Sequence, residues 1–87
     1  MGSYRLVFKR SVAKDLRAVP KADVARILNR IEALALADDP TPPGSEKLSG
    51  QNRYRIRQGL YRIVYAIDGD QLVVTVVKVG HRREVYR

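Results

Sequence analysis

The apolar residues of this chain change their spacing once, and the change falls at a segment rich in proline and glycine. Between residues 11 and 37 they recur every three to four positions, as on one face of an α-helix. From residue 53 onward they recur at every second position, as on one face of a β-strand. The segment between, 38–50, is typical of a loop. Because 87 residues can bury one modest core, this order predicts a single α+β domain spanning residues 1–87.

Two helices are predicted before the loop, preceded by a short strand over Tyr4–Phe8. The first helix spans Ser11–Val19, with Ser11 as its N-cap, and Pro20 ends it. The second spans Lys21–Ala37, where apolar side chains form one stripe and most charged ones lie opposite. The two helices should therefore form a hairpin with the bend at Pro20.

Three strands are predicted after the loop, joined by tight turns at 58–60 and 68–70: Arg53–Arg57, Tyr61–Ile67 and Leu72–Val79. The last strand is rich in β-branched residues, so we expect a central strand buried on both faces. The segment His81–Arg87 is a candidate edge strand. The predicted fold is β-α-α-β-β-β, an antiparallel sheet with the N-terminal helical hairpin packed on one face.

The charge of the chain indicates a polyanionic partner. The formal net charge is +8, and the part from Arg53 onward carries eight basic and three acidic residues. Such a surface favours nucleic acid or an acidic protein, although a solvated basic surface without a partner is the alternative. The chain has no cysteine, which is typical of a reducing compartment, and no apolar run of the roughly 20 residues that span a membrane. We therefore expect a cytoplasmic protein without a membrane partner.

The usual hydrolase motifs are missing. The sequence has one histidine, no P-loop glycine pattern and no His, Asp or Glu cluster at metal-ligand spacing, so neither a metal nor a cofactor is expected. Arginine binds phosphate through a bidentate fork, and an aromatic ring can stack on an unpaired base. Both residue types gather after the loop: Arg53, Arg55, Arg57, Arg62, His81, Arg82, Arg83, Tyr86 and Arg87. They suit single-stranded RNA, whose own 2′-OH can attack a phosphate that arginine stabilises.

Simpler roles exist for most of these residues. Alternating arginines also describe the solvent face of an amphipathic sheet. Tyr54, Tyr61 and Tyr65 share the apolar phase of their strands, so core packing is expected for them, whereas Tyr86 lies among charges. His81 suits proton transfer near neutral pH, but a histidine after a strand is also commonly a surface residue.

Several segments resemble one known family. Five stretches resemble toxins of the RelE/ParE superfamily from type II toxin–antitoxin systems, and the RelE type in particular: Tyr54–Arg57, Gly59–Tyr65, Val79–Tyr86, Tyr4–Leu16 and Lys47–Leu48. The resemblance covers nearly the whole chain and implies the same β-α-α-β-β-β fold. It also implies a ribosome-dependent, metal-independent endoribonuclease that cleaves mRNA in the ribosomal A site by 2′-OH attack, inhibits translation and is neutralised by a cognate antitoxin.

The resemblance assigns roles to individual residues. Arg55 and Arg57 match a basic pair at the scissile phosphate, Arg62 a phosphate-stabilising arginine, and Arg82 a general acid. Tyr86 matches a tyrosine that stacks on a base, and Arg53 and Arg83 are counted as further RNA-binding residues.

The identity of the general base stays open at this point. Well-known relatives carry lysines where this chain has Arg55 and Arg57, and arginine is a poor proton acceptor because its pKa exceeds about 12. His81 is the substitute candidate, Glu84 a weaker one, and ribosomal RNA a third source of the base.

Two other functions share the predicted fold. One is a ParE-type inhibitor that binds DNA gyrase, and the other is a non-catalytic homologue that acts as a DNA co-repressor only through its antitoxin complex. In each case the basic surface calls for an acidic, amphipathic antitoxin that folds over the helices and the arginine face.

Overall fold

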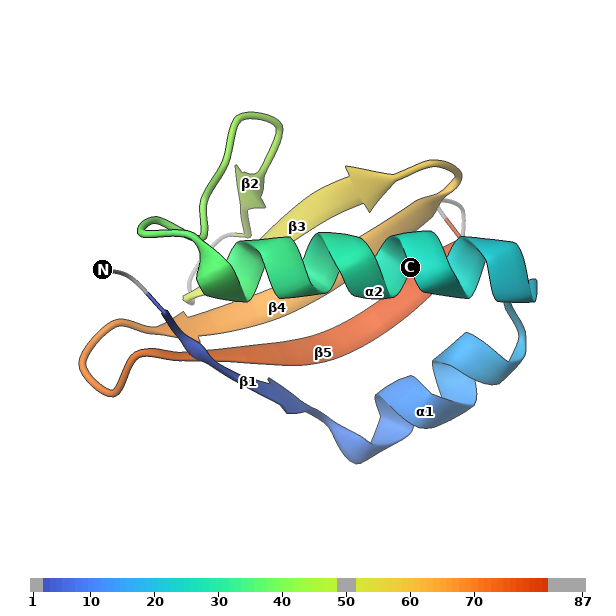
Figure 1. Ribbon diagram of the computed structural model, residues 1–87, viewed down its shortest axis with the longest axis horizontal. Coiled ribbons are helices and arrows are strands. Elements are labelled where there is room, and N and C mark those ends of the chain that lie inside the picture. Colours follow the sequence, from blue (N-terminus) through green and yellow to red (C-terminus); the bar gives the residue numbers. More distant parts are fainter. Residues whose placement is uncertain (1–2, 49–51, 82–87) are drawn as a thin grey trace.

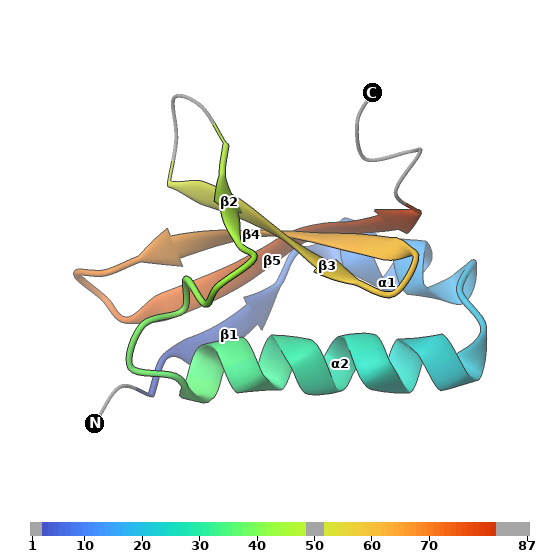
Figure 2. The same cartoon turned by 90° about the horizontal axis from the view of Figure 1, so that it is seen from above.

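The computed structural model describes residues 3–48 and 52–81 of the chain. It is a two-layer α+β domain in which α2 lies across one face of a five-stranded sheet and α1 packs against β5 (Figures 1 and 2). The elements follow in the order β1 (Arg5–Phe8), α1 (Arg10–Arg17), α2 (Lys21–Leu36), β2 (Glu46–Lys47), β3 (Arg53–Gln58), β4 (Tyr61–Asp68) and β5 (Val73–His81). The predicted fold class is confirmed.

The sheet is mixed, which corrects the expectation of a wholly antiparallel one. Its strand order is β1-β5-β4-β3-β2, and β1 runs parallel to β5 while the other pairs are antiparallel. The alternation of apolar residues along a strand is the same whether the neighbouring strand runs parallel or antiparallel, so the sequence could not predict this pairing. The strand β2 was not predicted, and it lies within the segment predicted as loop. Its two residues are too few to show an alternation of apolar and polar side chains.

The start of the first helix differs from the prediction. Lys9 occupies the N-cap with extended backbone angles, so Ser11 lies inside the first turn and the predicted serine cap is wrong. The Lys9 carbonyl accepts the Val12 N–H, while the Lys9 N–H donates to Val76 on β5. The backbone of β1 thus leads directly from the sheet into α1.

The core lies between α2 and one face of the sheet. Tyr65 is fully buried at its centre, Tyr54 stacks on it with ring centroids 5.9 Å apart, and Tyr61 packs at the margin, which confirms the predicted core role of all three. The central core cluster consists of Val12, Ile27, Ile31, Leu34, Ile56, Ile63, Tyr65, Val74, Val76 and Val79.

A β-bulge in β5 reverses which residues face the core. Val76 pairs with Tyr65 and Lys78 pairs with Val64, so Val77 is an extra residue without a partner on β4. Val76 is fully buried on the helix side, but after the bulge it is Val79 that turns inward. The expectation that this strand is buried on both faces is wrong, because no layer in the described part of the chain covers its second face and Val77 stays half-exposed.

Replacing Tyr65 with phenylalanine tests the buried hydrogen bond that ties the 38–45 loop to the core. The Tyr65 hydroxyl donates to the Pro40 carbonyl at 2.6 Å. We expect the variant to lose about 1–2 kcal/mol of unfolding free energy at neutral pH, measured by urea denaturation. Equal stability of the two proteins would contradict this role.

The same variant should change the alkaline limb of the stability curve. Burial raises the pKa of Tyr65 from 10.0 to about 12. Between these values the unfolded chain releases the tyrosine proton while the folded chain holds it, so stability falls as pH rises through this window. The phenylalanine variant should lack this contribution and show a shallower decline than wild type in unfolding experiments above pH 10.

Candidate nucleic-acid interface

The register of β3 and β4 places the predicted arginines together on the sheet face that carries no helix in the described residues. Arg57 pairs with Arg62, and Arg55 pairs with Val64. Ile56, between the two β3 arginines, is buried in the core on the opposite face. Because cross-strand partners project to the same side, the open face carries Arg53, Arg55, Arg57 and Arg62.

Three of these arginines line a hollow of about 330 Å³ that they share with Gly44 and Glu46. Glu46 stands on β2 directly opposite Arg55, and its Oε2 accepts a hydrogen bond of 2.7 Å from the Arg55 guanidinium. The Arg55 side chain is 14% exposed, whereas Glu46 is 66% exposed and borders the solvent. The hollow therefore combines phosphate-binding groups with one carboxylate.

Glu46 was not among the residues predicted from the sequence. It lies in the segment predicted as loop, and a lone glutamate before Lys47 shows no pattern that singles it out. Only the pairing of β2 with β3 brings it to the arginines.

Arg62 is the most buried arginine of the hollow, with 6% of its surface exposed. A cation held largely out of water interacts with an anion more strongly than an exposed one does, because the surroundings screen the charge less. The position of Arg62 suits the stabilisation of negative charge on a bound phosphate. Arg57 is exposed, so an approaching phosphate can reach its guanidinium from the solvent.

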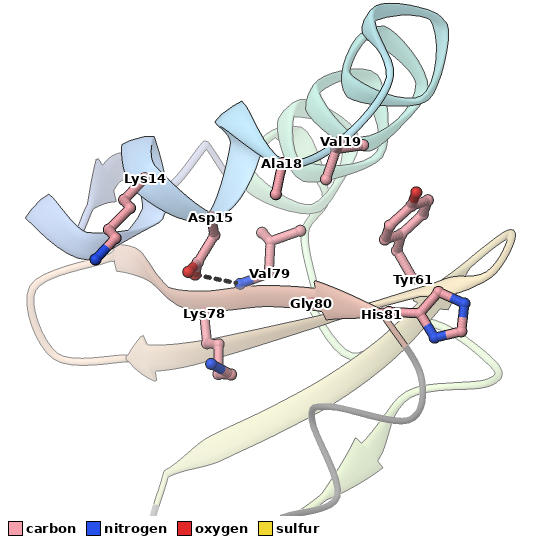
Figure 3. A pocket seen from close by; sticks show the side chains of 9 residues that line it. All are labelled: Lys14, Asp15, Ala18, Val19, Tyr61, Lys78, Val79, Gly80 and His81. Atoms are coloured by element: carbon pink, nitrogen blue, oxygen red, sulfur yellow. Dashed lines mark hydrogen bonds between the residues drawn. The ribbon is translucent and has the colours of Figure 1, made fainter.

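The structure does not bring His81 together with these arginines. His81 pairs with Tyr61, and the two rings meet edge-on with centroids 5.9 Å apart. Because Tyr61 packs against the core, its partner belongs to the helix side of the sheet rather than the arginine face. Both rings line a separate hollow beside Lys14 and Asp15 of α1 (Figure 3).

This second hollow forms where β5 continues beyond β1. The pairing of β1 with β5 stops at Val76, and α1 lies against the remaining edge. There the Asp15 Oδ2 accepts the Val79 N–H at 3.1 Å, a bond drawn in Figure 3. Asp15 thus satisfies a backbone donor that the bulged edge would otherwise expose.

The remaining predicted residues, Arg82, Arg83, Glu84 and Tyr86, lie outside the described residues, and their roles stay predictions. Within residues 3–48 and 52–81, no cluster of three or more His, Cys, Asp or Glu side chains is placed to hold a metal ion. No helix in that part of the chain is long and apolar enough to cross a membrane.

Comparison with known proteins places this architecture in one family. A model described as the ParE toxin of type II toxin–antitoxin system, parDE, matches residues 6–86. Toxin RelG of Mycobacterium tuberculosis is 30% identical over 97% of both chains. Two solved structures are similar over the whole fold. The toxin–antitoxin complex RelBE2 of M. tuberculosis has a TM-score of 0.79 at 25% identity, covering 94% of each chain. The RelB–RelE complex of Methanococcus jannaschii has a TM-score of 0.75 at 32% identity, covering 92% of this chain and 94% of that one.

The chain is thus a small α+β domain with a helical layer on one face of its sheet and a basic hollow on the other, and it has the fold of the toxins in these complexes. The chain belongs to the RelE/ParE superfamily and is a toxin of a type II toxin–antitoxin system.

Replacing Glu46 with glutamine should tighten the binding of inorganic phosphate to the arginine hollow, because Arg55 loses a competing carboxylate. The expected gain is about two- to fivefold, corresponding to an exposed ion pair worth up to about 1 kcal/mol. The measurement is an NMR titration that follows the arginine side chains. Glu32→Gln, at an exposed position of α2, is the control with the same change in charge. Equal affinities of the two variants would contradict the role of Glu46.

Proposed function

We propose that this toxin is a ribosome-dependent endoribonuclease that cleaves mRNA in the ribosomal A site and so inhibits translation. The observation that carries the proposal is the arginine hollow, in which Arg55, Arg57 and Arg62 meet beside Glu46. Guanidinium groups keep their charge at any working pH and stabilise the negative charge that develops on a phosphate under attack. The resemblance of the whole chain to RelE-type toxins supports the same activity.

The reaction uses chemistry that RNA itself supplies. The 2′-oxygen forms a bond to the adjacent phosphorus while the bond from phosphorus to the 5′-oxygen breaks, which leaves a 2′,3′-cyclic phosphate and a 5′-hydroxyl. Arg55 and Arg57 hold the scissile phosphate, and Arg62 stabilises the added charge. Arg82 supports protonation of the leaving oxygen and Tyr86 stacks on a base, while Arg53 and Arg83 bind the RNA outside the cut.

The proton of the 2′-OH needs an acceptor, and among the described residues Glu46 is the best-placed group, while Glu84 lies outside them. The arginines of the hollow cannot serve, because a guanidinium stays protonated at any working pH. His81 belongs to the other side of the sheet. Glu46 is exposed and hydrogen-bonded to Arg55, so its carboxylate stands beside the phosphate-binding groups. A carboxylate within hydrogen-bond reach is a competent general base.

An acidic antitoxin is the proposed protein partner. The two solved relatives described above are toxin–antitoxin complexes, and a chain with a net charge of +8 attracts an acidic segment. A mostly apolar hollow beside α1 suits one face of an amphipathic helix, and it is lined by Phe8, Val12, Leu16 and Leu28 together with Lys9 and Arg10. DNA would then be contacted only through the antitoxin complex.

Gyrase inhibition is the second candidate, because the matching family model is described as a ParE toxin. A gyrase inhibitor acts by binding and has no need of a phosphate-cleaving hollow. The two functions therefore differ in what loss of the arginine charge does.

Induction of the chain in cells lacking the antitoxin, with transcript 5′ ends mapped, tests the proposal. Wild type should produce new ends inside translated reading frames. Arg57→Gln should reduce them about 100-fold or more, as loss of a transition-state contact does. Arg57 is exposed, so the variant should fold. The matched control is Arg26→Gln, which removes a 66% exposed arginine from α2 and should cleave like wild type.

Three other results of these induction experiments would distinguish between the candidate functions or test further residues. Growth arrest without new transcript ends, equally severe in Arg57→Gln, would establish gyrase inhibition instead. A harmless wild type would favour the co-repressor reading. Loss of cleavage in a folded Arg82→Ala, Tyr86→Ala double variant would support the roles proposed for those two residues.

A further inference from the structure

Lys78 stands on the arginine face only because of the β-bulge. Val74 and Val76 precede it in steps of two and are fully buried, so simple alternation would turn Lys78 into the core. The extra residue, Val77, shifts the phase, and Lys78 instead pairs with Val64 on the open side of the sheet. Figure 3 shows its side chain directed away from α1, whereas Tyr61 points toward the helices. Bulges commonly re-aim one side chain next to a functional site.

Lys78 continues the row of cations on the arginine face across the sheet, and it also borders the hollow beside Asp15. It lies in one row with Val64 and Arg55, which are successive cross-strand partners on β4 and β3. Arg62 pairs with Gly80, two residues along β5, so Lys78 and Arg62 are diagonal neighbours on the same face. Diagonal neighbours have their Cα atoms about 7–8 Å apart, within reach of one another for long side chains.

The space between these cations suits a nucleic-acid backbone. Val64 has a short apolar side chain and Gly80 has none, so neither of these two residues places a bulky group between Arg62 and Lys78. Lys78 is exposed, and no ion pair of its side chain is found within the described residues. The nearby carboxylate of Asp15 is directed to the Val79 N–H.

We propose that Lys78 binds a second backbone phosphate of single-stranded RNA, next to the phosphate held in the arginine hollow. The RNA then crosses the strands from β3 toward β5. This inference rests on the proposed function, because it takes the arginine hollow as the site of the scissile phosphate. In this row, Arg55 and Lys78 stand on either side of the apolar Val64. Two separated cations suit the repeated phosphates of RNA better than they suit one carboxylate.

The salt dependence of RNA binding tests the contact directly. Each lysine–phosphate contact in single-stranded RNA changes the slope of log affinity against log salt by about 0.7. The probe is a fluorescent RNA oligonucleotide with 2′-O-methyl groups, which cannot be cleaved. Its binding to the full chain is followed by anisotropy over a range of potassium chloride concentrations.

Lys78→Gln should weaken binding and lower the slope by about 0.7, and Lys78→Arg should restore both. Lys21→Gln is the matched control, because it removes the same charge at an exposed position on α2, away from the arginine face. It should leave the slope at the wild-type value. Thermal unfolding of each variant verifies the fold.

A missing Lys78 contact and a wrong proposed function would give different results. Equal slopes for Lys78→Gln and Lys21→Gln, while Arg57→Gln still lowers the slope, would overturn the Lys78 contact and leave the RNA site standing. No RNA binding by wild type, or none that depends on Arg57, would overturn the proposed function and the contact together. A loss of affinity for polyglutamate in Lys78→Gln without any loss for RNA would assign Lys78 to an acidic protein partner instead.

Discussion

The helices of the described residues cover the sheet on one side only, and this one-sided packing decides where the side chains of the strands go. Because α2 covers a single face, the phase of each strand residue decides whether it enters the core or stands on the open side. In β3 this alternation sends Ile56 inward and Arg55 and Arg57 outward. A slip of one residue would exchange the two sets, so the register that stabilises the core also positions the cations.

In β5 the positions that face the core change partway along the strand. Up to Val76 it is held between β1 and β4, and beyond that point its free edge is covered by α1. The bulge at Val77 exchanges the inward and outward positions, and Asp15 accepts the backbone N–H that follows. The same segment therefore continues the core through Val79 and adds Lys78 to the basic face. The irregular end of β5 thus packs against α1, continues the core and carries one residue of the arginine face.

Much of the fold could be predicted because periodicity is a local property. The two helices, the turns around Gly59 and Gly69, and the alternation of the arginines all follow from residues close in sequence. The parallel pairing of β1, the approach of Glu46 to Arg55 and the outward turn of Lys78 depend on partners far along the chain. No local pattern marks them. Of the residues that line the arginine hollow, the sequence therefore pointed to Arg55, Arg57 and Arg62 but not to Glu46. It also did not point to Lys78, the residue of the proposed extension onto β5.

The chemical groups at the cut ends of the mRNA show whether the toxin cleaves RNA by attack of the 2′-OH. Purified toxin would be added to ribosomes holding a defined mRNA in the A site, and the fragments analysed by mass spectrometry. We expect an upstream fragment ending in a 2′,3′-cyclic phosphate, a downstream fragment beginning with a 5′-hydroxyl, and no cleavage when the nucleotide before the cut lacks its 2′-OH. Intact mRNA, or a downstream fragment with a 5′-phosphate, would contradict this mechanism.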